Sequence, residues 1–239
     1  MKTAICILGT GRCIDHTFEN LKDNIIDAFE DRDVFVYITE GPYSEKTSQL
    51  FNSLDNTFVH VVEEHPLEVS DYSFLNHWPP TTSVHGRTDL NKGRQVYLQM
   101  IKSRSVMNDL LDEKGTNYDR VIFSRMDVIY EESLAKNVEG LDLSKVWVPH
   151  FHHWHDGYND RFAISCREGM RQYFSLYDSA KKYVKEGHIL QAERTLKHHL
   201  ETLGVDTGIF KMRFSRIRNG KPHDDFKLLD NQAARPCDI

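Results

Sequence analysis

The chain has few cysteines, and their spacing does not fit a metal or disulfide framework. Four occur among its 239 residues, and they are widely scattered: Cys6, Cys13, Cys166 and Cys237. A zinc ribbon needs cysteines in closely spaced pairs, and a disulfide-stapled domain needs them at high density. The spacing therefore disfavours both classes of protein and fits a reducing, cytoplasmic-type compartment.

The sequence also lacks a basic tail and a long apolar run. Its formal net charge is -6 at pH 7, whereas nonspecific binding to nucleic acid needs clustered Lys and Arg side chains. The apolar run at the N-terminus ends at Gly9, which makes it too short for a signal peptide. No stretch approaches the roughly 18 to 20 apolar residues that span a bilayer. We therefore expect a soluble, cytoplasmic protein without a nucleic-acid partner or a transmembrane segment.

No internal repeat, low-complexity tract or Pro/Gly linker divides the chain. A mass of 27.9 kDa is enough for one substantial core. We therefore expect a single domain over residues 1–239. The polar segment 219–239 is a candidate for a loose C-terminal tail.

Short apolar runs rich in β-branched residues alternate with longer amphipathic runs, which is typical of an α/β fold. Strands are expected at 3–8, 33–39, 57–62, 119–123, 145–149, 161–165 and 207–214. Helices are expected at 16–29, 44–53, 91–112, 167–185 and 189–203. Ser165 and Glu168 form a capping box that predicts a helix start near Cys166. Gly204 is the expected left-handed terminator of the last helix.

One long segment, 66–91, has little periodicity and is rich in Pro, Ser, Thr and His. A long loop within a compact domain is often a lid or a binding loop. Its aromatic residues, which include Trp78, are candidates for contact with a sugar face.

The run 118–127, with the sequence YDRVIFSRMD, predicts an apolar strand that brings an arginine and a carboxylate to its C-terminal end. Ligands of open α/β sheets collect outside the carboxyl ends of the strands. Asp127 can hold a divalent metal there, and Arg125 can meet a phosphate. Together they predict a site for a metal-bound nucleoside diphosphate.

Further candidates for donor binding are the residues Thr10, Gly11 and Arg12, which follow the first expected strand. Small residues let the backbone approach a ligand, but the segment lacks the third glycine of a dinucleotide fingerprint and the lysine of a P-loop. An ordinary strand-to-helix turn is the alternative.

Basic residues also gather near the start of the helix expected at 91–112: Arg87, Lys92 and Arg94. Exposed N–H groups and cations at a helix start favour a diphosphate. A solvated basic turn explains the same residues without a ligand.

The Arg125-Met126-Asp127 segment resembles the metal-binding strand end of GT-A glycosyltransferases, in a group whose signature is Arg, any residue, Asp. The segment 158–165 is similar to the family's strand after the acceptor loop, and Glu193 occupies the place of its acidic residue near the acceptor hydroxyl. The resemblance implies a GT-A, Rossmann-like fold with a mixed, mostly parallel sheet flanked by helices. It implies a UDP- or GDP-sugar donor, a glycan acceptor and a divalent metal, Mn²⁺ or Mg²⁺, held by Asp127 with His223.

Two carboxylates are candidates for catalysis. An inverting transfer needs a general base within hydrogen-bond reach of the acceptor hydroxyl. Glu193 is the first candidate for that base, and Asp160 is either a ligand of the sugar hydroxyls or the base itself. A solvated carboxylate at a helix start is the alternative interpretation of Glu193.

The residues 150–156 have the most unusual composition in the chain, with the sequence HFHHWHD. In a transferase they form a loop beside the acceptor, with these contact residues: His152, His153, Trp154, His155 and Asp156. A surface loop whose polar groups are satisfied within the protein is the alternative. Two further functions remain open. The imidazoles fit a zinc-dependent hydrolase in composition, although their spacing matches no strong zinc signature, and Trp78 with Trp154 fits a noncatalytic carbohydrate-binding module.

Overall fold

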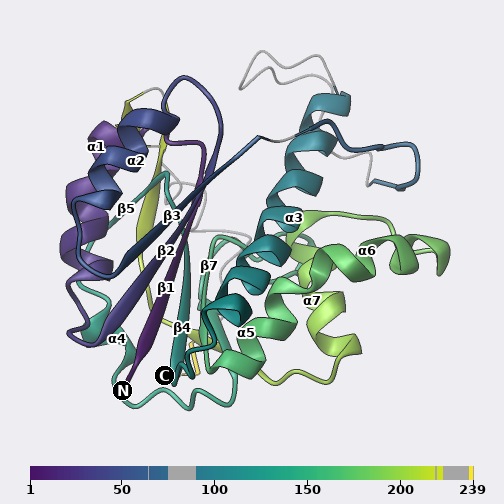
Figure 1. Ribbon diagram of the computed structural model, residues 1–239. Helices are drawn as coiled ribbons and strands as arrows, with labels where there is room; N and C mark the ends of the chain where they lie inside the picture. Colours follow the sequence, from purple (N-terminus) through teal and green to yellow (C-terminus); the bar gives the residue numbers. More distant parts are fainter. Residues whose placement is uncertain (64, 75–89, 219, 223–236, 239) are drawn as a thin grey trace.

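The structure of the protein is a computed structural model that describes residues 1–63, 65–74, 90–218, 220–222 and 237–238. A central sheet lies between two layers of helices (Figure 1). The expected α/β architecture with a mixed, mostly parallel sheet is confirmed. Within the described residues, no helix combines the length and apolar character that crossing a membrane requires. All four cysteines are free.

The main sheet has seven strands in the order β3-β2-β1-β4-β7-β6-β8. Their bounds are β1 (Thr3–Gly9), β2 (Arg32–Thr39), β3 (Thr57–Val62), β4 (Arg120–Arg125), β6 (Val146–Pro149), β7 (Phe162–Ser165) and β8 (Thr207–Phe210). Strand β7 is antiparallel to both of its neighbours, and every other pair is parallel. A second, smaller sheet has the order β10-β9-β5. Its strands are β5 (Val128–Tyr130), β9 (Phe214–Arg218) and β10 (Lys221–Pro222).

Helices cover both faces of the main sheet (Figure 1). Their bounds are α1 (Ile14–Leu21), η1 (Lys22–Ile26), α2 (Ser44–Asn52), α3 (Leu90–Lys114), α4 (Ala135–Val138), η2 (Trp154–Asp156), α5 (Arg167–Phe174), α6 (Leu176–Lys185) and α7 (Ala192–Thr202). Helices α1 and α2 lie on one face, and α3, α5, α6 and α7 lie on the other.

Alternation along the strands builds a core on each face of the sheet. In β1, Ala4 and Cys6 join the core under α3, α5, α6 and α7, whereas Ile5 and Ile7 join the core under α1. A strand that is buried on both faces reads as a continuous apolar run rather than an alternating one. This explains why the expected strands were short and uniformly apolar.

The capping box predicted at Ser165 is wrong. Helix α5 starts at Arg167 after Cys166, close to the expected position, but without a side-chain capping bond. The Ser165 hydroxyl donates to the carbonyl of Lys145 instead, at 2.9 Å, because Ser165 is the last residue of a buried strand and faces its neighbour. The Glu168 carboxylate accepts from Gln172 in the next turn of α5.

Three other expected boundaries are corrected. The helix expected at 167–185 is two helices, with Ser175 between α5 and α6. The helix expected at 16–29 continues as the π-helical turn η1 and ends at Ile26. The strand expected at 207–214 ends at Phe210, and the chain then leaves the main sheet to form β9 against β5. Gly204 does adopt the expected left-handed conformation, with φ 68°.

Most of the expected tail, 219–239, lies outside the described residues. Within it, Asp238 is bonded to Ile209 of β8 by its backbone N–H at 2.8 Å and by its carboxylate at 2.6 Å.

Candidate functional site

Several chain segments with polar residues meet at one end of the main sheet, which we call the carboxyl edge. The segments are 10–12 after β1, 126–127 after β4, 150–161 between β6 and β7, and 211–213 after β8. They meet because β1, β4, β6 and β8 are parallel and β7 starts where they end. The Met126 N–H donates to the Leu8 carbonyl at 3.0 Å, which ties the ends of β1 and β4 together. The carboxyl edge is where this class of sheet binds ligands.

Asp127 is held by two arginines at this edge. Arg125 donates to both carboxylate oxygens, from Nε at 2.7 Å and from Nη2 at 2.8 Å. Arg218 donates to the same carboxylate at 2.5 Å. Burial raises the pKa of the Asp127 carboxyl, but the charges and hydrogen bonds of the two arginines outweigh it and hold the pKa far below its usual range. Asp127 is therefore an ionised carboxylate that aligns two guanidinium groups.

Strand β9 adds positive charge beside Asp127. The Ile217 N–H donates to the Asp127 carbonyl at 2.8 Å, so the side chains on either side of Ile217 are brought to the carboxyl edge. Burial lowers the pKa of Arg218, Asp127 raises it, and three other arginines lower it further. We call Arg218 and these three the arginine cluster, whose members are Arg12, Arg125, Arg216 and Arg218.

The two candidate catalytic carboxylates lie together and share one arginine. Arg161 reaches Asp160 Oδ1 from Nη1 at 3.4 Å and Glu193 Oε1 from Nη2 at 3.2 Å. Arg104, a fully buried residue of α3, donates to the Asp160 carbonyl at 2.5 Å and lies 3.5 Å from its carboxylate. Gln191, before α7, donates to the other oxygen of Glu193. Asp160 and Glu193 are each 4% exposed, so their environment can control their protonation.

The pKa values of this carboxylate pair move in opposite directions. Burial raises the pKa of Asp160, but Arg161 and Arg104 lower it more, and the net shift is downward. Burial also raises the pKa of Glu193, and there the opposing effect of Arg161 is too small to reverse the shift, since Asp160 raises it as well. A pair of carboxyls separated in this way is an arrangement that enzymes use for acid and base roles.

The arginine cluster lies close enough to the carboxylate pair to act on it electrostatically. The charges of Arg125 and Arg216 contribute to the lowered pKa of Asp160. Among the described residues, the Tyr173 hydroxyl and Arg161 Nε are buried without a hydrogen-bond partner, and Tyr173 lies within the field of Arg104, Asp160 and Arg161. Unpartnered buried polar atoms are rare in folded proteins, and each calls for an explanation such as strain, a catalytic role or a bound water or ion.

The loop 150–156, which we call the histidine loop, has an inner and an outer part. His152 and His153 are buried. His153 contacts two backbone carbonyls, with Nδ1 at 3.0 Å from Gly157 and Nε2 at 2.8 Å from Pro149. Trp154 is half-buried and donates to His152 Nδ1 at 3.0 Å. These three residues stabilise the loop, whereas the sequence predicted them as acceptor contacts.

The backbone of the histidine loop is strained. His152, His155 and Asp156 have φ values of 60°, 55° and 58°, in the left-handed region that non-glycine residues rarely adopt. Such strain costs about 1–3 kcal/mol per residue and clusters at functional sites.

The outer part of the loop faces solvent and borders a hollow of about 210 Å³. His155 and Asp156 are exposed, and Lys197 of α7 forms an ion pair with Asp156 at 2.8 Å. The hollow is lined by His155, Asp156, His188, Arg194, Lys197, His198 and Glu201. The hollow borders the face of α7 that carries Arg194, Lys197, His198 and Glu201, whereas Glu193 is buried and does not line it.

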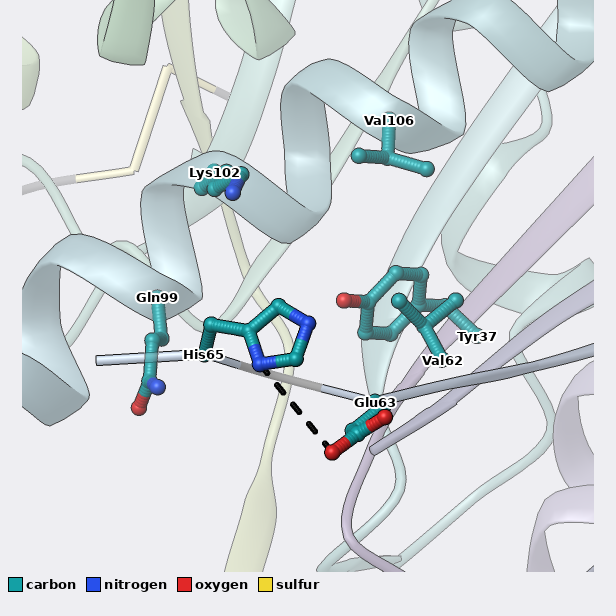
Figure 2. Close-up of a pocket in the computed structure, with 7 residues that line it drawn as sticks. All are labelled: Tyr37, Val62, Glu63, His65, Gln99, Lys102 and Val106. Carbon is teal, nitrogen blue, oxygen red and sulfur yellow. Dashed lines mark ion pairs between the residues drawn. The ribbon is translucent and has the colours of Figure 1, made fainter. Parts of the chain in front are cut away.

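A second, much smaller pocket lies between the ends of β2 and β3 and helix α3. Figure 2 shows Tyr37 and Val62 from the strands facing Gln99, Lys102 and Val106 of α3, with Glu63 and His65 paired at 4.0 Å at its rim. Its volume is about 40 Å³, which leaves room for only a few water molecules. It is too small for a nucleotide.

The other residues predicted to bind the donor have less direct support from the structure. Thr10 and Arg12 are exposed at the end of β1. Gly11 has φ 71°, and a Cβ there would lie 2.2 Å from Thr47 Oγ1, so packing against α2 already requires glycine. Arg94 lies over the ring of Phe74, 5.2 Å from its centroid. Arg87, His223 and the side chain of Lys92 lie outside the described residues.

The described residues do not fit the divalent metal that the family resemblance implies. Both oxygens of Asp127 already accept from arginines. No group of three or more His, Cys, Asp or Glu side chains suited to a metal ion occurs in the described part of the chain. The same finding leaves the zinc-hydrolase alternative without a supporting donor set, because His152 and His153 bind within the protein.

Four site residues were missed in the sequence: Arg104, Arg161, Arg216 and Arg218. Arg161 sits beside a named candidate at the start of an expected strand, so the sequence contained a signal for it. Arg216 and Arg218 show a period-two spacing that is typical of one face of a strand. For Arg104 the sequence contained no signal, because an arginine within a long helix is usually a solvent-exposed polar position.

The α/β fold is similar to that of a solved glycosyltransferase. Among solved structures, this chain is similar to the apo form of the glycosyltransferase GlyE from Streptococcus pneumoniae TIGR4, with a TM-score of 0.50 and 14% sequence identity. The similarity covers 87% of this chain and 45% of that one, so this chain spans less than half the length of GlyE. Residues 1–221 match the family described as Domain of unknown function (DUF7796), and the protein belongs to that family. No curated protein matches the chain.

Proposed function

We propose that the protein is a glycosyltransferase that moves a sugar from a nucleoside diphosphate donor, a UDP- or GDP-sugar, to a hydroxyl of a glycan acceptor. The observation that carries this proposal is the adjacency of the arginine cluster and the buried carboxylate pair at the carboxyl edge. The similarity to GlyE supports the fold on which this site is built.

The donor side of the site consists of Thr10, Gly11, Arg12, Arg125 and Asp127. The diphosphate of a departing nucleotide gains negative charge as the bond to the sugar breaks. Guanidinium groups held in advance where that charge develops stabilise the transition state. Roles for Arg87, Lys92 and Arg94 stay predictions. Asp127 as a metal ligand does not fit its contacts with Arg125 and Arg218, and His223 lies outside the described residues.

The carboxylate pair supplies the base. The acceptor oxygen forms a bond to the anomeric carbon, the bond from that carbon to the diphosphate oxygen breaks, and its electron pair leaves with the nucleotide. Glu193 takes the acceptor proton, because its raised pKa makes it the stronger base of the pair. Asp160, with its lowered pKa, stays ionised and accepts hydrogen bonds from the sugar hydroxyls.

The acceptor approaches over the outer part of the histidine loop. The hollow between this loop and α7 presents charged and imidazole groups, and Glu193 is buried in the first turn of the same helix. His155 and Asp156 contact the glycan there, with Trp154 at the border, whereas His152 and His153 support the loop from inside.

Thermal-shift screening with UDP- and GDP-sugars, with and without Mn²⁺, tests the donor. We expect at least one donor to raise the melting temperature of the protein. The same donor should be hydrolysed slowly to free nucleotide, and the release of nucleotide should be faster when a glycan acceptor is present. Glu193→Gln should then lower the transfer rate by about 10²–10⁴-fold, the usual contribution of a general base, while donor binding persists. Glu186→Gln, an exposed carboxylate at the end of α6, serves as the matched control.

No shift with any of these donors would contradict the proposal. Glycan binding that needs no nucleotide and survives Glu193→Gln would identify a noncatalytic carbohydrate-binding module instead.

A further inference from the structure

Glutamine is an unusual residue for the place that it takes at the start of α7. Gln191 is the N-cap of this helix, and its side-chain oxygen Oε1 accepts from the Arg194 N–H at 2.7 Å. Helix N-caps favour the shorter residues Asn, Asp, Ser, Thr and Gly. Capping alone therefore does not call for a side chain as long as that of glutamine.

The extra length lets the same amide reach the candidate base. Because the Arg194 N–H can only donate, the amide oxygen of Gln191 faces it and the amide Nε2 is left to face Glu193. Nε2 donates to Glu193 Oε2. Arg161 reaches the other carboxylate oxygen, Oε1, from Nη2 at 3.2 Å. The two donors hold both oxygens of the carboxylate and so fix the rotation of the Glu193 side chain.

The backbone from which Gln191 extends is fixed as well. The Gln191 N–H donates to Thr195 Oγ1 at 2.9 Å, and the Gln191 carbonyl accepts from the Thr195 N–H at 2.7 Å. Leu190, directly before it, is buried and donates its N–H to the Ser73 carbonyl at 2.8 Å. A functional group is held in a productive geometry when its supporting residues are themselves locked by hydrogen bonds and packing. Gln191 meets this condition.

The groups that act on the Glu193 carboxyl come from three parts of the fold. Arg161 and Asp160 lie before β7, Gln191 precedes α7, and Tyr97 of α3 lies within the field of both carboxylates. Burial and Asp160 raise the pKa of Glu193, whereas Arg161, the Glu193 N–H and the Gln191 amide lower it. Removal of the amide therefore favours the neutral carboxyl.

We propose that Gln191 is a positioning residue for the transfer reaction, whose amide holds the Glu193 carboxylate in the orientation that takes the acceptor proton. Gln191 acts through Glu193 and takes no proton itself. This inference rests on the proposed function, because that function gives Glu193 the role of the base.

Gln191→Asn separates the two bonds of the amide. Asparagine is a favoured N-cap, so the melting temperature should stay close to that of the parent protein, but its side chain is one methylene too short to reach Glu193. The donor for the assay is the UDP- or GDP-sugar that raises the melting temperature most, with a glycan acceptor. We expect kcat to fall by about 10–100-fold with little change in KM for the donor, since a misplacement of about 1 Å can cost about 10²-fold.

Titration of the Glu193 carboxyl gives a readout that needs no substrate. ¹³C NMR of protein labelled at the glutamate carboxyls follows it, and Glu193→Gln identifies the resonance. The titration of Glu193 should move to higher pH in Gln191→Asn, because a donor to the charged form is lost. Gln191→Glu keeps the length and the capping oxygen but places a like charge beside Glu193, so it should move the titration further in the same direction.

Gln49→Asn is the matched control for both measurements. Gln49 is exposed on α2, where its amide donates to the Glu45 carboxylate at 3.4 Å. This substitution also shortens a glutamine that is paired with a glutamate. It should leave kcat and the titration of Glu193 unchanged.

The possible results distinguish this inference from the proposed function. If Gln191→Asn retains full turnover, or leaves the titration of Glu193 at the same pH, Gln191 is only a helix cap and the inference is overturned, while the transferase assignment remains. If the parent protein turns over no UDP- or GDP-sugar, the proposed function is overturned, and the role of Gln191 in transfer falls with it even where the titration moves.

Discussion

Glu193 and Asp160 illustrate how single residues acquire their chemistry from neighbours that are distant in the sequence. Burial raises the pKa of Glu193, Arg161 lowers it, and Asp160 raises it. If ionised Glu193 is the base, the acid limb of the rate profile lies above the ordinary glutamate pKa of about 4.5. The rate then rises with pH through that limb and is lost below it, where the carboxyl is protonated.

Two substitutions should move this limb in opposite directions. Arg161→Gln removes the cation that favours the carboxylate, so the limb moves to higher pH. Asp160→Asn removes a like charge, so the limb moves to lower pH. Profiles of kcat/KM between pH 4.5 and 8, with melting curves as a folding control, measure both. If the acid limb stays at the same pH in both variants, the protonation of Glu193 does not control the rate.

Sequence reasoning reached the acids of the site but not most of its cations. Asp127 and Asp160 could be named because each lies near the end of an expected strand, and Glu193 because the resemblance to GT-A glycosyltransferases implies an acid there. Arg218 is 91 positions from Asp127, and only the pairing of β9 with β5 brings the two together. A period of two predicts the face of a strand, but it does not predict which strand lies opposite.

At the scale of elements, the end of the histidine loop is fitted closely onto the first turn of α7. A Cβ on Gly157 would lie 2.1 Å from the Glu193 carbonyl carbon and 2.4 Å from the Arg194 nitrogen. Gly157→Ala must therefore push the loop away from α7. We expect a loss of about 1–3 kcal/mol in the free energy of unfolding and a fall in transfer rate that exceeds the effect on donor affinity.

Urea unfolding and initial rates check this prediction. Gly41→Ala is the matched control, because a Cβ at Gly41 meets no atom within 4 Å. Normal turnover in Gly157→Ala would mean that contact between the loop and α7 does not position Glu193.

The helical layer of α5, α6 and α7 contains a histidine that must stay neutral. His199 is fully buried, with Nε2 at 2.8 Å from the Gln172 carbonyl and Nδ1 at 2.8 Å from the Tyr183 hydroxyl. Burial lowers the pKa of His199 from 6.5 to about 4. The unfolded chain therefore binds a proton first, so stability is full above about pH 6.5 and is lost as the pH falls toward 4.

Such a shift predicts a loss of about 2 kcal/mol in the free energy of unfolding between pH 7.5 and pH 5. Urea unfolding at the two pH values measures it. His199→Gln should be less stable at pH 7.5 and should show a smaller difference between the two pH values. Equal pH dependence in the variant and the parent would assign the effect to other groups, such as His188, whose pKa burial also lowers to about 4.

At the scale of the whole molecule, composition and periodicity were enough to predict the layers of helices and strands. They did not predict the strand pairings that bring distant segments together. The buried parallel strands and the long α3 follow from local pattern. The antiparallel β7 and the small β5-β9-β10 sheet do not, because they depend on long-range pairing of short, ordinary segments. That small sheet contributes Arg216 and Arg218 to the arginine cluster, so the least predictable part of the fold supplies half of that cluster.

The contrast between an acidic molecule and a cationic edge predicts how nucleotide binding responds to salt. The charge of -6 is spread over the chain, whereas the arginine cluster is confined to the carboxyl edge. The screening length falls from about 10 Å at 0.1 M to about 3 Å at 1 M ionic strength. UDP or GDP affinity, measured by calorimetry in EDTA, should therefore fall roughly tenfold between these salt concentrations.

The effect of salt on the affinity should be smaller in Arg12→Gln, which has one cation fewer. Uridine or guanosine, which lack phosphate, should show little change, and unfolding curves at both salt concentrations control for the fold. Equal salt dependence of nucleoside and nucleotide would mean that the phosphates do not meet the arginines.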